Sequence, residues 1–122
     1  MDSKNLESVK SEKFIYLTTV GRKTGKAHTV ELWFASQNAR IFLSHEGEPT
    51  DWMKNLISNK RVSAKISVFK FNADARIASD DGSREVGKRV LYEKYYGPAN
   101  KKMIDDWFEL STVVELTPLN QA

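Results

Sequence analysis

Apolar side chains recur at every second position over much of the chain, which is the period of a strand with one buried face. The pattern is clear in AHTVELWFAS, where Val30, Leu32 and Phe34 alternate with the residues between them. Runs of β-branched and aromatic residues extend the same pattern to other segments. The sequence predicts six strands, over residues 14–20, 27–36, 40–45, 62–68, 73–79 and 108–118.

Two segments change to the period of a helix. In EGEPTDWMKNLISNK, Thr50 can cap a short helix that carries Trp52 and Leu56 on one side. A longer helix is predicted over residues 80–97, where apolar residues recur at helical spacing until Gly97 and Pro98 end it.

Shorter helical segments complete the pattern. Asp80 and Asp81 are predicted to cap the longer helix. A helical stub is predicted over residues 101–107, and a turn over residues 69–72. Residues 1–13 are compatible with a short capping helix or with a loose arm, and both alternatives stay open.

Six strands without regular strand-helix alternation argue against a doubly wound parallel sheet. We therefore expect a mainly β (α+β) fold, a six-stranded antiparallel barrel with two or three flanking helices, in one domain over residues 1–122. The mouths and outer grooves of such barrels offer ligand sites.

Composition limits the chemistry. With no cysteine and two histidines, the chain has no thiolate nucleophile or disulfide, and we expect no metal site. No apolar run approaches the roughly 20 residues that cross a bilayer, and the start, MDSKNLESVKSEK, lacks the apolar core of a signal peptide. We expect a cytoplasmic protein without a membrane span. A net charge of +3 suits an anionic ligand, although surface lysines give the same figure.

The most unusual charge placement is GRKTGK, which holds three cations, two glycines and a threonine in six positions between two predicted strands. The spacing matches neither a Walker loop nor a Rossmann fingerprint. Gly21 and Gly25 would let backbone amides approach an oxyanion, and Thr24 adds a hydroxyl donor. The residues alone fit a phosphate or carboxylate site and a solvated hairpin turn equally well.

The order of several motifs adds a resemblance. YLTTVGRKTGKAHTVELWF, followed by IFLSHEG, DWMKNLISN, RVSAKISV and ADARIAS, resembles the deazaflavin-dependent nitroreductase family of split β-barrel flavoproteins. The resemblance covers roughly residues 14–118 and includes a tryptophan three residues before Asn-Leu and a final Glu-Leu-Thr-Pro. It implies a split barrel like that of the pyridoxamine-phosphate oxidases. Ala27 and His28 stand where the family often has proline and arginine.

The resemblance also implies a cofactor and its contacts. Many members use coenzyme F420, a deazaflavin with a phosphate and a polyglutamate tail, and FMN is the alternative cofactor. The family's basic segment, which binds the phosphate-bearing chain, and the residues that border the cofactor correspond here to Arg22, Lys23, Thr24, Gly25, Lys26, Ser44, Trp52 and Asn55.

Other residues are candidates for the substrate side of the site. His45 could donate a proton near neutral pH, although a plain strand histidine is the ordinary interpretation. The family places tyrosines of a late helix near its substrate, which corresponds to Tyr92 and Tyr96, whereas Tyr95 is expected in the core. No side chain is singled out as catalytic.

The first functional hypothesis is an F420-dependent oxidoreductase that passes a hydride to a small electrophile such as a quinone, a nitro compound or an activated alkene. An FMN-binding reductase and a cofactor binder without turnover are the alternatives. A remote alternative is a barrel that binds single-stranded nucleic acid through Lys65 and Lys70 with Trp33, Phe69 and Phe71. The interspersed acidic residues argue against nucleic acid. The resemblance implies a homodimer.

Overall fold

The computed structural model describes residues 1–79 and 82–119. In chain order the elements are α1 (Ser3–Ser8), β1 (Phe14–Val20), β2 (Ala27–Trp33), β3 (Ala35–Gln37), β4 (Arg40–Glu46), α2 (Asp51–Ser58), β5 (Arg61–Ile66), β6 (Phe69–Ala78), α3 (Ser83–Tyr96), α4 (Lys101–Trp107) and β7 (Ser111–Pro118).

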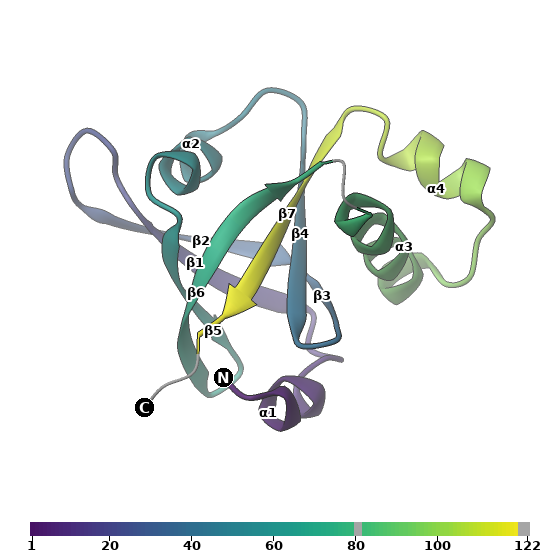
Figure 1. Ribbon diagram of the computed structural model, residues 1–122, viewed down its shortest axis with the longest axis horizontal. Helices are drawn as coiled ribbons and strands as arrows, with labels where there is room; N and C mark the ends of the chain where they lie inside the picture. Colours follow the sequence, from purple (N-terminus) through teal and green to yellow (C-terminus); the bar gives the residue numbers. More distant parts are fainter. Residues whose placement is uncertain (80–81, 120–122) are drawn as a thin grey trace.

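The strands of the described residues form one antiparallel sheet of seven strands in the order β2-β1-β5-β6-β7-β4-β3 (Figure 1). β2 and β3 are opposite edges of this sheet, yet only Phe34 separates them along the chain. The sheet therefore has to curl until its two edges approach each other. The predicted antiparallel split barrel is confirmed, with seven strands because the predicted strand 27–36 is divided in two at Phe34.

The inside of the curled sheet holds the main core. Alternate residues of β1, Ile15 and Leu17 among them, are fully buried there. α2 contributes Trp52 and Leu56 to the same cluster, and α1 contributes Leu6. The two short helices thus lie against this core, and of the two alternatives for the N-terminal segment the capping helix is the one observed.

α3 and α4 lie together at one side of the sheet, beside β3, β4 and β7 (Figure 1). A second cluster joins Phe42 and Val113 of the sheet to Leu91 of α3 and Ile104 of α4. The close packing depends on Gly87, where an added Cβ would lie 2.7 Å from Val113 and 2.8 Å from Phe42. The described residues contain four helices in total, so the expected two or three were too few.

Several boundaries differ from the sequence prediction. The last strand begins at Ser111 and not at residue 108, because Phe108 is the C-cap of α4. The predicted turn over residues 69–72 is wrong, because the β5–β6 turn falls at Ser67 and Val68. Ser67 has a φ of 55°, and Val68 is 79% exposed instead of buried. The N-cap of α3 is Gly82, and the predicted capping residues Asp80 and Asp81 lie outside the described residues. In the part of the chain that is described, no helix has the length and apolar character to cross a membrane.

Candidate functional site

The basic sequence forms the tip of the β1–β2 hairpin, which projects beyond the barrel beside α2 (Figure 1). Several amides of the tip are bonded within it: the N–H of Gly21 donates to Lys26 O at 2.7 Å, and the N–H of Gly25 donates to Gly21 O at 2.9 Å. The N–H of Lys26 donates to Thr24 Oγ1 at 3.2 Å. The two glycines therefore shape the turn, and the N–H groups of Gly21, Gly25 and Lys26 are already bonded within it.

Arg22 anchors the tip to α2. Its N–H and its Nη1 donate to Asn55 Oδ1 at 3.2 and 2.9 Å. Asn55 is 2% exposed, and its Nδ2 donates to Thr19 Oγ1 at 3.2 Å. Asp51 lies 3.5 Å from the guanidinium. The structure thus brings two predicted cofactor contacts, Arg22 and Asn55, onto each other, and both serve to position the hairpin.

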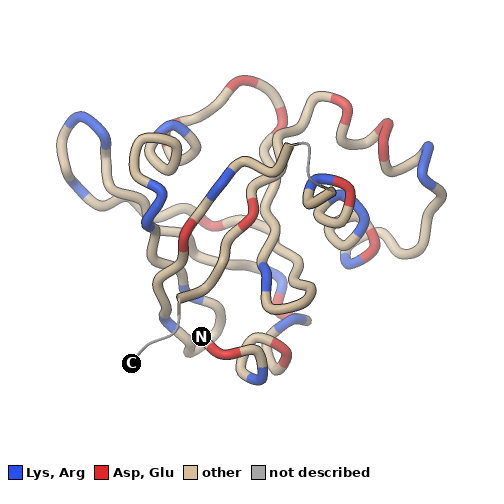
Figure 2. Tube along the Cα trace, viewed as in Figure 1, with Lys and Arg blue, Asp and Glu red and all other residues tan. Residues whose placement is uncertain are grey.

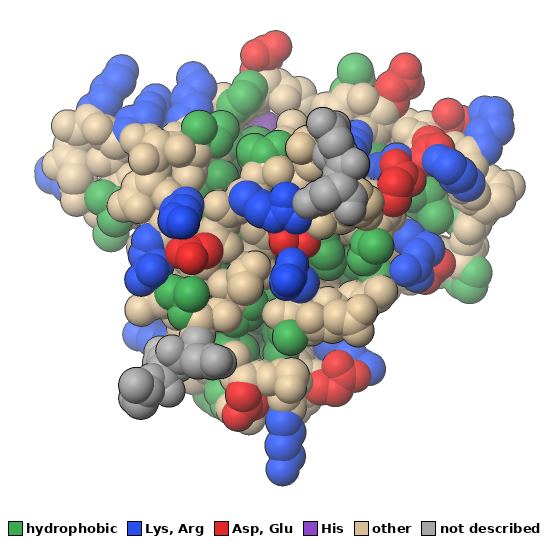
Figure 3. Space-filling model, viewed as in Figure 1, with side chains coloured by type: hydrophobic (Ala, Val, Ile, Leu, Met, Phe, Trp, Pro, Cys, Tyr) green, Lys and Arg blue, Asp and Glu red, His purple; other side chains and the backbone are tan. Residues whose placement is uncertain are grey.

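The remaining tip cations are unpaired. No ion pair or hydrogen bond of the Lys23 and Lys26 ammonium groups occurs within residues 1–79 and 82–119. Figure 2 shows Lys and Arg positions along the hairpin tip and on neighbouring α2, and Figure 3 shows their side chains gathered over the same part of the surface. The ammonium groups of Lys23 and Lys26 are therefore available to an anion.

A cavity of about 490 Å³ lies between the tip, β2 and α2. Its lining residues are Gly21, Arg22, Lys23, Thr24, His28, Thr29, Val30, Asp51, Trp52 and Asn55. The volume is within the range of cofactor sites, and one end is cationic while Val30 and Trp52 give an apolar wall. A phosphorylated, ring-bearing ligand fits this donor set, although the Asp51 carboxylate at the rim repels a phosphate.

The end of β4 supplies two predicted residues, Ser44 and His45, that point to opposite sides of the sheet. The His45 ring lies edge-on to Trp52, with 6.0 Å between the ring centroids, and its Nε2 is 2.9 Å from Glu48 O. His45 thus borders the wall of the cavity. Ser44, the preceding residue of the strand, faces the side of Phe42, which packs against α3, and does not line the cavity.

Tyr92 and Tyr96 belong to an aromatic cluster at the other end of β2. Tyr96 lies 4.9 Å from Trp107 and 6.1 Å from Trp33, measured between ring centroids, and Tyr92 lies 5.2 Å from Tyr96. Since β2 rises about 3.3 Å per residue, its two ends are roughly 20 Å apart. The structure therefore does not bring these tyrosines into the cavity at the tip.

The sequence analysis did not identify every residue of the cavity or of the aromatic cluster. Thr29 and Val30 line the cavity although neither was a candidate, and Trp107 joins the aromatic cluster. Helical spacing could have related Tyr92 to Tyr96, but the contact with Trp33 depends on the fold of distant segments. No local signal identifies it.

The structure makes most of the aromatic rings that the nucleic-acid alternative requires unavailable for stacking. Phe71 is 3% exposed and Phe69 packs against the main core, so neither ring is available for stacking beside Lys65 and Lys70. Trp33 is exposed but stacks on Tyr95, with 4.1 Å between the ring centroids.

The family model for F420H(2)-dependent quinone reductase matches residues 3–106, and the chain belongs to this family of oxidoreductases. The match covers the hairpin tip, β2 and α2, the three segments that build the cavity. No curated protein matches the chain significantly.

Solved structures share the fold. A conserved hypothetical protein of Mycobacterium tuberculosis has 20% identity and a TM-score of 0.79, over 98% of this chain and 82% of that one. An F420-H2 dependent reductase has 22% identity and a TM-score of 0.67, over 85% and 93%. A structure described as a domain-swapped dimer has 19% identity and a TM-score of 0.69, over 85% and 79%. Split barrels like the pyridoxamine-phosphate oxidases are also among the similar folds.

Proposed function

We propose that this protein binds coenzyme F420 and uses its reduced form to reduce a small electrophile, a quinone in the first place and a nitro compound or activated alkene in the second. The observation that carries the proposal is the unpaired cation Lys23 in the lining of a cavity with an apolar wall, with the unpaired Lys26 on the same hairpin tip. The family of F420H(2)-dependent quinone reductases supports both the cofactor and the class of acceptor.

Each residue of the site has a distinct part in this proposal. Lys23, Thr24 and Lys26 bind the phosphate-bearing chain of the cofactor by charge-assisted hydrogen bonds. Arg22 holds the tip in place through Asn55, while Trp52 supplies apolar surface for the ring system. The bound cofactor supplies the hydride chemistry, and the protein supplies orientation and shielding from water.

Titration of the purified protein with F420 and, separately, with FMN tests the proposal. We expect F420 to bind more tightly than FMN, because the three donors of the tip, Lys23, Thr24 and Lys26, suit the longer anionic chain of F420. The double variant K23Q/K26Q should bind F420 at least tenfold more weakly, since two charge-assisted bonds are removed. K4Q/K102Q is the matched control, because both lysines are exposed and lie in α1 and α4, away from the tip (Figure 1).

Turnover requires a second measurement. Oxidation of reduced F420 should accelerate when a simple quinone is added to the protein, and the K23Q/K26Q variant should lose this activity through a raised KM for the cofactor. Binding without turnover would indicate a cofactor carrier. Binding of neither F420 nor FMN would contradict the proposal.

An FMN enzyme on the same barrel is the second candidate. FMN has a single phosphate, which needs fewer cations than the tip provides. A visible absorption spectrum of the protein as purified distinguishes the two, since co-purified FMN would show its own bands. Release of FMN on denaturation would establish this alternative.

A homodimer is proposed as the assembly, by resemblance to the family and to the domain-swapped dimer of similar fold. Light scattering on the eluting protein measures the mass directly. A single species at the 13.9 kDa of one chain would contradict the dimer.

A further inference from the structure

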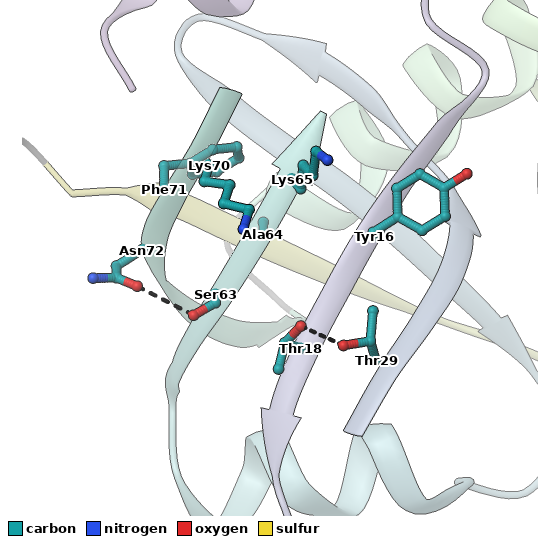
Figure 4. A pocket seen from close by; sticks show the side chains of 9 residues that line it. All are labelled: Tyr16, Thr18, Thr29, Ser63, Ala64, Lys65, Lys70, Phe71 and Asn72. Atoms are coloured by element: carbon teal, nitrogen blue, oxygen red, sulfur yellow. Dashed lines mark hydrogen bonds between the residues drawn. The ribbon is translucent and has the colours of Figure 1, made fainter. Parts of the chain in front are cut away.

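A second cavity, of about 720 Å³, lies on the outer face of the sheet, where β2, β1, β5 and β6 run side by side (Figure 4). Apart from Ala64 and Phe71, its lining comes from two neighbouring rows of outward-facing side chains. The first row crosses the strands as Thr29, Thr18, Ser63 and Asn72, which are register partners in that order. The second row continues from Tyr16 to Lys65 and Lys70. We call these seven residues the outer platform.

The two lysines of the outer platform are direct cross-strand partners. Like charges in this position destabilise an antiparallel pair, so the arrangement works against the sheet unless an anion lies between them. Lysines often protect the edge of a sheet from other chains, but β5 and β6 are interior strands and have no free edge to protect. The usual structural reason for lysine on a strand is therefore missing here.

The nearby acidic groups do not neutralise this pair. Glu31 accepts a hydrogen bond from the Tyr16 hydroxyl at 2.9 Å, with β1 between it and β5. Asp74 pairs with Arg61 at 3.0 Å. Within the described residues, neither Lys65 nor Lys70 has an ion pair or hydrogen bond of its side chain.

The first row adds polar groups beside the charges. Thr18 and Thr29 are hydrogen-bonded to each other at 2.7 Å, and Ser63 Oγ donates to Asn72 Oδ1 at 3.3 Å. The Asn72 amide nitrogen has no hydrogen bond within the described residues. Figure 4 shows the side chains of both rows on the same side of the four strands. Since strands lie about 4.8 Å apart, the platform is roughly 14 Å wide, enough for two anionic groups of one small molecule.

We propose that the outer platform is a second anion-binding site, which takes a small organic molecule with two anionic groups, carboxylates or phosphates. Lys65 and Lys70 bind the charges, and the Asn72 amide, together with the one hydroxyl of Thr18 and Thr29 that does not donate within their pair, binds the adjoining oxygens. This site is separate from the cavity at the hairpin tip, although Thr29 lines both. The proposal does not rest on the proposed function.

A second copy of this chain fits the platform less well than a small anion. A two-fold axis through the platform would bring the same two lysines of the other copy onto it, adding repulsion instead of relieving it. The exposed rings needed for nucleic acid are also missing, apart from Tyr16, which is 40% exposed.

Two-dimensional amide NMR of the labelled protein tests the site, with citrate as the carboxylate probe and pyrophosphate as the phosphate probe. We expect saturable shifts on β5 and β6, with the tighter probe identifying the anion class. K65Q/K70Q should weaken binding at least tenfold, while K23Q/K26Q should leave it unchanged. Removal of facing like charges should keep or raise the urea midpoint, so the variant remains interpretable.

Three results would overturn the proposal. Shifts that never saturate, or that K65Q/K70Q leaves unchanged, would show adventitious ions only. A dimer that dissociates in K65E/K70E, with no probe binding in the wild type, would make the platform a contact between copies. Tighter binding of a single-stranded oligonucleotide than of either probe, lost in K65Q/K70Q, would make it a nucleic-acid surface. F420 titration of K65Q/K70Q should match the wild type, which separates this test from that of the tip.

Discussion

Asn55 joins the hairpin to α2 through both ends of its side-chain amide. Its oxygen accepts two hydrogen bonds from Arg22, and its nitrogen donates to buried Thr19. The substitution N55L keeps the size but removes all three bonds and leaves polar groups unpartnered. We expect it to lower the free energy of unfolding by about 2–3 kcal/mol, measured by urea unfolding.

N55D is the matched comparison. Its carboxylate still accepts from Arg22, and the Thr19 hydroxyl can donate to it, so it should lose less stability than N55L. Hydrogen exchange should speed up at residues 21–26 in N55L and change little in N55D. Equal stability of N55L and the wild type would show that the hairpin does not depend on this side chain.

At the same scale, the sequence did not show how the predicted site residues contact each other. The family resemblance marked Arg22 and Asn55 as separate cofactor contacts, yet they lie 33 positions apart and bind each other. Only the packing of α2 against β1 brings them together, and no local pattern encodes that. By contrast, unpaired cations at the tip could be expected, because GRKTGK itself contains no acidic residue.

At the scale of elements, α3 rests on the sheet at Gly87. A methyl group there would lie 2.7 Å from Val113 and 2.8 Å from Phe42, so the helix would have to move outward. Overpacking of this kind costs about 1–3 kcal/mol and exceeds the gain of at most about 1 kcal/mol from replacing a helical glycine. We expect G87A to be destabilised and G87V more so, in urea unfolding. A stabilised G87A would mean that the helix accommodates the methyl group.

The contact between α3 and α4 should depend on pH. Asp105 lies 2.6 Å from both Lys101 and Lys88, and these bonds lower its pKa from 3.8 to about 2. Because the unfolded carboxyl binds its proton at higher pH, the stabilisation is complete above about pH 4 and is lost as pH falls toward 2.

D105N isolates this effect. The difference in free energy of unfolding between wild type and D105N should shrink between pH 4 and pH 2, measured by urea unfolding at each pH. D106N is the control, since Asp106 pairs with Lys102, which is exposed, and not with the buried Lys88. A difference that stays constant over this range would contradict the assignment.

Alternation agrees with the burial seen in β1 and β5, but β4 and β7 bury consecutive residues, and alternation does not show where a strand changes partner. Leu32 and Phe34 keep the alternation across the corner between β2 and β3, so the two strands look like one. Val68 continues the alternation of Val62, Ala64 and Ile66, yet it lies in the turn. The position of that turn follows from the register in which β5 pairs with β6. Register is a property of the two paired strands and not of one strand's pattern.

At the scale of the whole molecule, the corner at Phe34 is where the curled sheet joins its two edges. Phe34 is fully buried, and its N–H donates to the Tyr95 hydroxyl at 3.0 Å. That hydroxyl also lies 2.9 Å from Phe34 O and 2.7 Å from Lys13 O, and it donates to one of them. Lys94 Nζ donates to Phe34 O at 2.8 Å. α3 therefore fastens both edges of the barrel through one corner.

Y95F removes only the hydroxyl from this corner, because the ring can still stack on Trp33. We expect a loss of about 1–2 kcal/mol, since the buried N–H of Phe34 loses its acceptor. Hydrogen exchange should quicken at the corner, residues 33–35, and at Lys13 and Phe14, because the same hydroxyl also lies within hydrogen-bond distance of Lys13 O, just before β1. Y96F is the matched control: Tyr96 is 49% exposed, and its hydroxyl has no hydrogen bond within the described residues. If Y95F and Y96F behave alike, the barrel is closed by apolar packing of Phe34 and not by the hydroxyl.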